Sequence, residues 1–111
     1  MWILTPDGFY SIVQKPHDRE RNTLTIRARV REDLERLRAH LPTLGPIHED
    51  PAADYRFRAQ AHAVAVGRAL ARLAEGISYD NFKKTVRHQQ GQEREALYHE
   101  VWQTLAELQE E

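Results

Sequence analysis

The sequence predicts an α+β fold: an antiparallel sheet of four or five strands, two helices on one face, and a C-terminal helical extension. Residues 24–30 and 54–62 alternate between apolar and polar side chains, which is typical of half-buried strands. Residues 31–41 and 63–75 instead place apolar side chains at helical spacing. We expect one domain over residues 1–111, with the sheet and two helices in residues 1–77 and the extension in residues 78–111.

The two alternating segments are the strands on which the functional prediction depends. In residues 24–30 the polar face carries Thr25, Arg27 and Arg29. In residues 54–62 this face carries Asp54, Arg56, Arg58, Gln60 and His62. The opposite, apolar face of residues 54–62 is predicted to carry Tyr55, Phe57, Ala59 and Ala61. If the two strands are neighbours, four arginines lie together on one side of the sheet.

The remaining elements of the first 77 residues follow from turn residues and apolar spacing. Residues 2–4 and 9–15 read as a hairpin around a Thr-Pro-Asp-Gly turn, and residues 16–22 form a charged loop. Leu34, Leu37 and Leu41 make the apolar stripe of the first helix, which Pro42 ends. Residues 47–49 are expected to form a short edge strand, and residues 63–75 the second helix.

The order from residue 9 is therefore strand, strand, helix, strand, strand, helix. This order predicts a permuted split βαβ (ferredoxin-like) sheet, in which residues 9–15 replace the usual last strand. In that topology residues 24–30 and 55–62 are central neighbours and both helices cover the apolar face. The arginines are then left on the other face.

Residues 78–111 are predicted to be helical. Ser78 or Asp80 is expected to cap a helix that carries Phe82 and Val86, and the residues around Gly91 break it. A longer helix over residues 93–110 then carries one apolar stripe, made of Leu97, Val101, Leu105 and Leu108. This amphipathic helix could pair with a second subunit, so a homodimer is expected.

Composition excludes several classes of function. The formal net charge is −1, so any site for a polyanion must come from local clustering of basic residues. The chain has no cysteine, which excludes disulfides, thiol catalysis and cysteine-ligated zinc and is compatible with the cytoplasm. No segment approaches the roughly 20 apolar residues of a membrane span. Histidine spacing gives no zinc motif, so neither a metal nor another cofactor is expected.

Three stretches resemble a family of small uncharacterised bacterial proteins. They are Tyr-Asp-Asn-Phe-Lys at residues 79–83, Gln-Gly at 90–91 and Tyr-His-Glu-Val-Trp at 98–102. The Thr-Pro-x-Gly-Phe turn at residues 5–9 and the alternating arginines at 25–29 are also similar. The resemblance spans nearly the whole chain and implies an independent domain, without implying an activity.

The arginines are candidate phosphate ligands, because a guanidinium is a planar, permanently charged fork of donors. Arg27, Arg29, Arg56 and Arg58 on adjacent strands would form a platform for a phosphodiester. Two alternatives are that Asp54, Glu49 or C-terminal glutamates neutralise these arginines, or that the face is a dimer interface.

Four other residues are candidates for catalysis. His17 and His62 lie in or beside the arginine strands and could move protons, since imidazole titrates near neutrality. Tyr79 and Lys83, with Tyr98, could complete a pocket, although a helix cap in which Tyr79 and Phe82 anchor the helix in the core is the favoured interpretation. His99 is expected to pack beside Tyr98 and Trp102.

Two hypotheses of function follow from these residues. The first is a metal-independent phosphodiesterase or nuclease acting on RNA or a small, possibly cyclic, oligonucleotide. The second is a non-catalytic, dimeric binding or regulatory module that uses the sheet face or the last helix as its interface.

Overall fold

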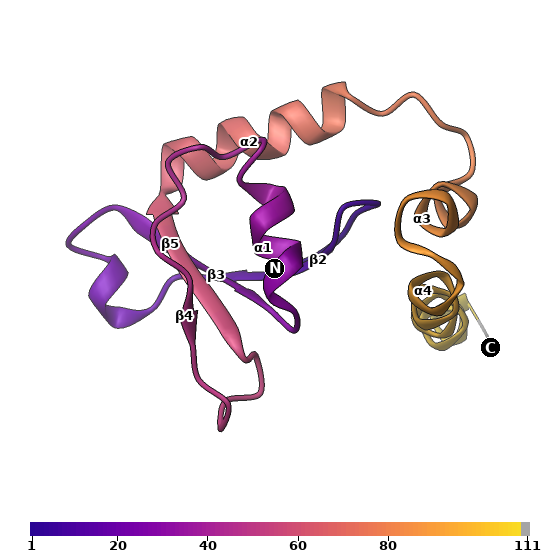
Figure 1. The fold of residues 1–111 in the computed structure, drawn as a ribbon, viewed down its shortest axis with the longest axis horizontal. Helices are drawn as coiled ribbons and strands as arrows, with labels where there is room; N and C mark the ends of the chain where they lie inside the picture. The colour runs from indigo at the N-terminus through magenta and orange to yellow at the C-terminus, as the bar shows by residue number, and fades with distance from the viewer. Residues whose placement is uncertain (110–111) are drawn as a thin grey trace. The chain divides into compact units, whose positions relative to one another are not determined.

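The computed structural model describes residues 1–109 and divides the chain into two compact units. The first unit is made of Met1–Leu4 and Gly8–Ile77, and the second of Thr5–Asp7 and the chain from Ser78 onward. Figure 1 shows the sheet with its helices in the first unit and the further helices of the second unit. No helix of the described residues is long and apolar enough to cross a membrane.

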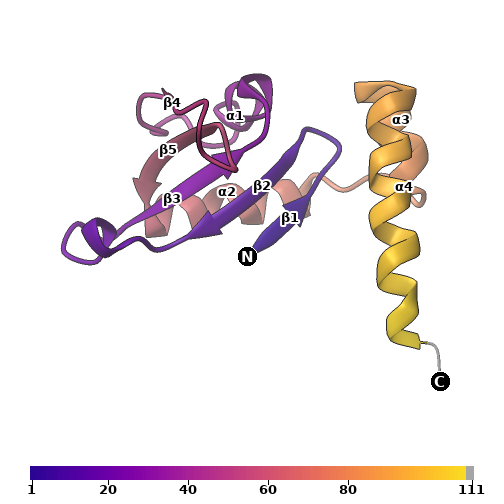
Figure 2. The same ribbon diagram turned by 90° about the horizontal axis from the view of Figure 1, so that it is seen from below.

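The first unit contains a five-stranded antiparallel sheet in the order β1-β2-β3-β5-β4 (Figure 2). The strands are β1 (Trp2–Leu4), β2 (Phe9–Val13), β3 (Thr23–Ala28), β4 (His48–Glu49) and β5 (Phe57–His62). The prediction that the two alternating segments are neighbours is confirmed, because β3 pairs with β5 along its whole length. The predicted hairpin and the short edge strand are also present, as β1–β2 and β4.

Helices α1 (Arg31–Leu37) and α2 (Ala63–Glu75) pack on the apolar face of the sheet. Ile26 of β3 is fully buried there and belongs to one core with Leu34 of α1 and Val66 of α2. Helix α1 ends four residues before the predicted residue 41. Leu41 nevertheless stays in the core, since its N–H bonds to the carbonyl of Leu37 at 2.9 Å and continues the turn.

The second unit contains helices α3 (Phe82–Gln90) and α4 (Gln92–Ala106), followed by a 3-10 turn at Glu107–Gln109. Asn81 caps α3, rather than Ser78 or Asp80, by accepting a 3.0 Å hydrogen bond from the N–H of Lys84. Gly91 separates the helices with a φ of +96°, a conformation that favours glycine. The predicted last helix ended at Glu110, which lies outside the described residues.

The interior of the second unit combines aromatic stacking with hydrogen bonds to the Thr5–Asp7 segment. The ring of Phe82 stacks on Tyr98 at 5.8 Å, and the Tyr98 hydroxyl donates to the carbonyl of Thr5 at 3.3 Å. Gln90 Nε2 donates to the carbonyl oxygens of Pro6 and Asp7 at 2.9 Å each. These contacts explain why three residues near the N-terminus belong to this unit.

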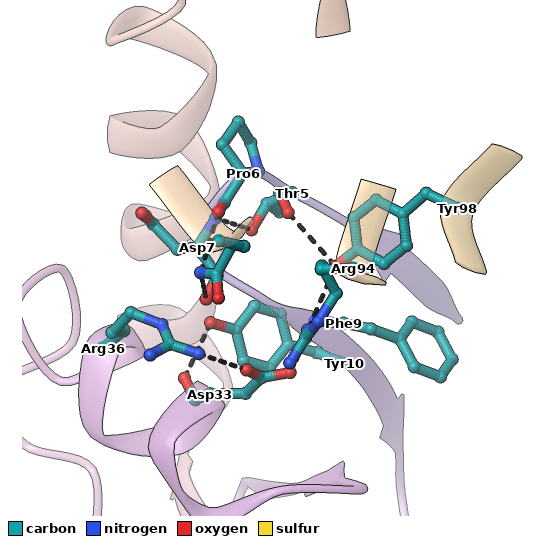
Figure 3. A network of polar contacts seen from close by, with 10 residues as sticks. Thr5, Pro6, Asp7, Phe9, Tyr10, Asp33, Arg36, Arg94 and Tyr98 are labelled. Atoms are coloured by element: carbon teal, nitrogen blue, oxygen red, sulfur yellow. Dashed lines mark hydrogen bonds and ion pairs between the residues drawn. The ribbon is translucent and has the colours of Figure 1, made fainter. Parts of the chain in front are cut away.

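A buried carboxylate fixes the start of β2 against α1 within the first unit (Figure 3). Asp33 is 1% exposed; its Oδ2 accepts from the N–H of Phe9 at 3.0 Å and its Oδ1 from Arg36 at 2.6 Å. The hydroxyl of Tyr10 donates to the Asp33 carbonyl at 2.8 Å. Gly8 lies so close that a Cβ there would be 2.6 Å from Asp33 Cγ. The position therefore excludes a side chain for steric reasons.

Substituting Gly8→Ala is expected to destabilise the protein by about 1–3 kcal/mol, because the added methyl overlaps a buried side chain that is held by hydrogen bonds. Equilibrium unfolding in urea would measure the loss. Gly67→Ala in α2 is the matched control, since a Cβ added at that position would have no neighbouring atom within 4 Å. A Gly8→Ala variant as stable as the control would contradict the steric argument.

Candidate functional site

Arg27 of β3 and Arg58 of β5 occupy directly opposed positions in the central strand pair. Opposed residues of an antiparallel ladder place their side chains on the same face, with Cβ atoms about 5 Å apart. Ser11 of β2 and His48 of β4 extend this row on either side, opposite Arg27 and Arg58 respectively. We call the polar side of β2, β3 and β5, with Arg27, Arg29 and Arg58, the arginine face.

The two opposed guanidiniums are held by neutral partners. Arg27 Nη2 donates to Ser11 Oγ at 2.7 Å, and Arg58 Nη2 donates to the carbonyl of Tyr55 at 3.2 Å. The Nε atoms of both arginines are buried without a hydrogen-bond partner. Neither side chain forms an ion pair within the part of the chain that the structure describes. Two like charges directly opposite one another are unfavourable, so this arrangement favours an anion.

Tyr55 lies among the arginines, and the prediction that it faces the apolar core is wrong. The guanidinium carbons of Arg27 and Arg29 are 4.6 Å and 4.3 Å from the centre of its ring, which is only 4% exposed. Strand β5 begins at Phe57, so the alternation of side chains does not extend back to Tyr55. Cation–π attraction to this ring holds the two arginines in place.

Arg56 is neutralised by an acidic neighbour. It precedes β5, and its guanidinium makes 2.6 Å contacts through Nε and Nη2 with Glu49 of β4. Of the alternatives to phosphate binding, neutralisation by Glu49 therefore describes Arg56. Arg29 donates to the backbone carbonyl of Asp54 and not to the side-chain carboxylate of that residue.

A buried carboxylate, Asp18, organises the loop end of the arginine face. Asp18 is fully buried and accepts hydrogen bonds from Thr23 Oγ1 at 2.6 Å, Thr25 Oγ1 at 2.8 Å and the N–H of Lys15 at 2.8 Å. Gln60 Nε2 lies 3.3 Å from Asp18 Oδ1 and also contacts His17 Nε2. Because a carboxylate only accepts, the Gln60 amide is the donor, and His17 Nε2 is the acceptor.

These contacts set the charge state of Asp18. Burial alone would raise the pKa of the carboxyl group, but hydrogen bonds from Thr23, the Lys15 N–H and Thr25 outweigh it. The pKa of Asp18 is therefore lowered below its usual value, and the residue is a fixed negative charge at neutral pH.

The candidate catalytic residues lie in different parts of the molecule. His17 belongs to a 3-10 turn (Pro16–Asp18), and its half-exposed side chain reaches the arginine face through Gln60. His62 ends β5 opposite Thr23, on the same side of the sheet. Both histidines are thus on the arginine face.

Tyr79 and Lys83 belong to the second unit. Tyr79 packs against the ring of Phe82 at 6.4 Å. Lys83 Nζ is 3.1 Å from His99 Nδ1 and 4.3 Å from the centre of the Trp102 ring. The expectation that His99 packs beside Trp102 is confirmed, because the two rings stack at 5.4 Å.

Sequence reasoning missed Asp18, His48 and Trp2 as members of this face. The alternation of β5 predicts Gln60 on the same face as Arg58, and the strand pairing confirms this. His48 and Trp2 required the strand register, which no local pattern gives. Among residues 1–109, no three histidine, aspartate or glutamate side chains gather where they could hold a metal ion.

Comparison with protein families, with curated proteins and with solved structures finds no match for this chain. The resemblance to small bacterial proteins stays a prediction.

Substituting Asp18→Asn is expected to reduce the free energy of unfolding by about 2 kcal/mol at neutral pH, because four donors lose a charged acceptor. The folded pKa of Asp18 is lowered, so its stabilising effect is present above about pH 4 and is lost as the pH falls through the folded pKa. Urea unfolding from pH 7 to pH 2 should therefore show the difference between wild type and variant shrinking in acid. A difference that is constant over this range would contradict the charged state of Asp18.

Proposed function

We propose that the arginine face binds the phosphodiester backbone of RNA or of a small oligonucleotide. The observation that carries the proposal is the directly opposed pair, Arg27 and Arg58, which has neutral partners and buried, unpaired Nε atoms. A phosphate between them supplies the negative charge that the described residues do not. The phosphate oxygens also accept hydrogen bonds from the guanidinium groups of both arginines.

The strand order supports a finer interpretation of the fold. From the order β2-β3-β5-β4, with α1 and α2 on one face, we propose a permuted split βαβ (ferredoxin-like) sheet with β1 added at one edge. Open faces of such sheets serve RNA recognition in other proteins, and this is an analogy of fold alone.

Metal-independent cleavage of the bound phosphodiester is the second candidate function. His17 favours it, since this imidazole joins the arginine face through Gln60, which lies next to Arg58 along β5. We place cleavage second because Nε2 of His17 accepts from Gln60 and is not directed at a phosphate site. In this proposal Tyr79 and Lys83 have no assigned role.

Substituting Arg27→Gln or Arg58→Gln is expected to weaken binding of a labelled RNA oligonucleotide about tenfold, because each change removes a charge-assisted contact to phosphate. Each should also reduce the slope of log affinity against log salt by about 0.7 for a single strand. Fluorescence anisotropy in EDTA at several salt concentrations measures both quantities.

The control for net charge is Arg68→Gln, on the exposed surface of α2. Equal losses in all three variants would show non-specific attraction and contradict the proposed site. The same reactions, run on a gel, test cleavage: products that are formed by wild type and lost in His17→Ala would establish it, whereas intact RNA would limit the function to binding.

A second copy of the chain is the partner that we propose for α4. Leu97, Leu105 and Leu108 are 59%, 56% and 83% exposed, and together with Val101 they are spaced by four, four and three residues along α4 and the 3-10 turn that follows it. This spacing gives a stripe that another α4 can cover by coiled-coil packing. The pairing uses residues of α4 and of the turn that follows it, none of which belongs to the arginine face.

Substituting Leu105→Glu is expected to weaken the dimer by about 2 kcal/mol or more, since it places a charge in the apolar stripe. Sedimentation velocity over a range of protein concentrations would measure this. Gln103→Glu introduces the same charge on another side of the same helix and should leave the dimer intact. A wild-type chain that stays monomeric would contradict the pairing.

A further inference from the structure

One row of directly paired residues crosses all five strands of the sheet on the arginine face. The register pairs Trp2 with Ser11, Ser11 with Arg27, Arg27 with Arg58, and Arg58 with His48. Residues paired in this way point to the same side. The row therefore begins with an indole at the β1 edge, continues through the two opposed arginines, and ends with an imidazole at the β4 edge. Four strand spacings of about 4.8 Å make it about 19 Å long.

The aromatic residues of this face form a connected series in which Trp2 is the exposed member. Trp2 meets Phe9 edge-to-face at 5.7 Å, and Phe9 meets Tyr55 at 6.3 Å. The Tyr55 ring is only 4% exposed, with Arg27 and Arg29 over it, whereas Trp2 is 67% exposed. An edge-to-face contact leaves at least one face of the indole free of Phe9, so Trp2 can accept another flat ring.

We infer that Trp2 stacks on an unpaired base, and that the ligand is a single-stranded nucleic acid lying across the β-strands from Trp2 to Arg58. This inference rests on the proposed function, since the arginines supply the phosphate contacts. Ser11 separates Trp2 from Arg27 in the row and is small. A nucleotide whose base stacks on the indole can therefore place a backbone phosphate at the arginines.

The preference of this face for single strands over duplexes follows from which surfaces of the bases each form exposes. In a duplex the bases are stacked inside and present only their edges, so an indole on a sheet cannot stack on them. In a single strand each base has a free face, and stacking on an aromatic side chain contributes to affinity without dependence on sequence. The arrangement thus selects unpaired nucleic acid.

The test uses the full chain carrying Trp102→Phe, so that Trp2 is the single tryptophan, and three probes. These are an oligouridine of about ten nucleotides, an abasic oligonucleotide of the same length, and a duplex. Oligouridine is expected to quench Trp2 fluorescence and to bind more tightly than the other two probes. Adding Trp2→Ala should weaken oligouridine binding about tenfold and leave the abasic probe unaffected, whereas Trp2→Phe should retain most of the affinity.

The outcomes separate the two proposals. Oligouridine affinity that survives Trp2→Ala but falls with Arg58→Gln would overturn the stacking inference and leave the phosphate site standing. Duplex binding as tight as oligouridine binding would also overturn it. No binding of any probe would overturn both. Because Trp2 is largely exposed, the alanine variant is expected to fold, and its far-ultraviolet circular dichroism checks this.

Discussion

The antiparallel pairing of β3 with β5 is the constraint on which the rest of the structure depends. The register that buries Ile26 opposite Ala59 also places Arg27 opposite Arg58, because consecutive residues alternate between faces. A slip of one residue in either strand would exchange the faces and put charge into the core. The packing of the core under α1 and α2 therefore determines which charges meet on the other side.

The sequence was sufficient to predict this central pair and the antiparallel sheet around it. Alternation in residues 24–30 and the helical spacing in residues 63–75 are local signals, and the structure has β3 and α2 at those positions. Alternation extended past Phe57, the first paired residue of β5, predicts the wrong face for Tyr55. The error matters for the site, since Tyr55 is the ring that holds Arg27 and Arg29.

The rest of the candidate site could not be predicted, because it arises from pairing between distant residues. Asp18 and Gln60 are far apart in the sequence, and no pattern near either residue predicts that they meet. Trp2 joins the row of Arg27 only through the registers of two strand pairs. Local patterns identify which residues are polar and which face they share within one strand. Register between strands depends on turn geometry and on the whole core.

The close approach of Gly8 and Asp33 has a consequence for how this sequence can vary. Any side chain at position 8 needs a smaller residue at position 33, yet a smaller residue there removes the acceptor for the Phe9 N–H. Neither position can therefore change alone without loss, and a simultaneous change that restores the space does not restore the hydrogen bond. Natural variants of this chain should retain the two residues together, although they are far apart in the sequence and belong to different elements.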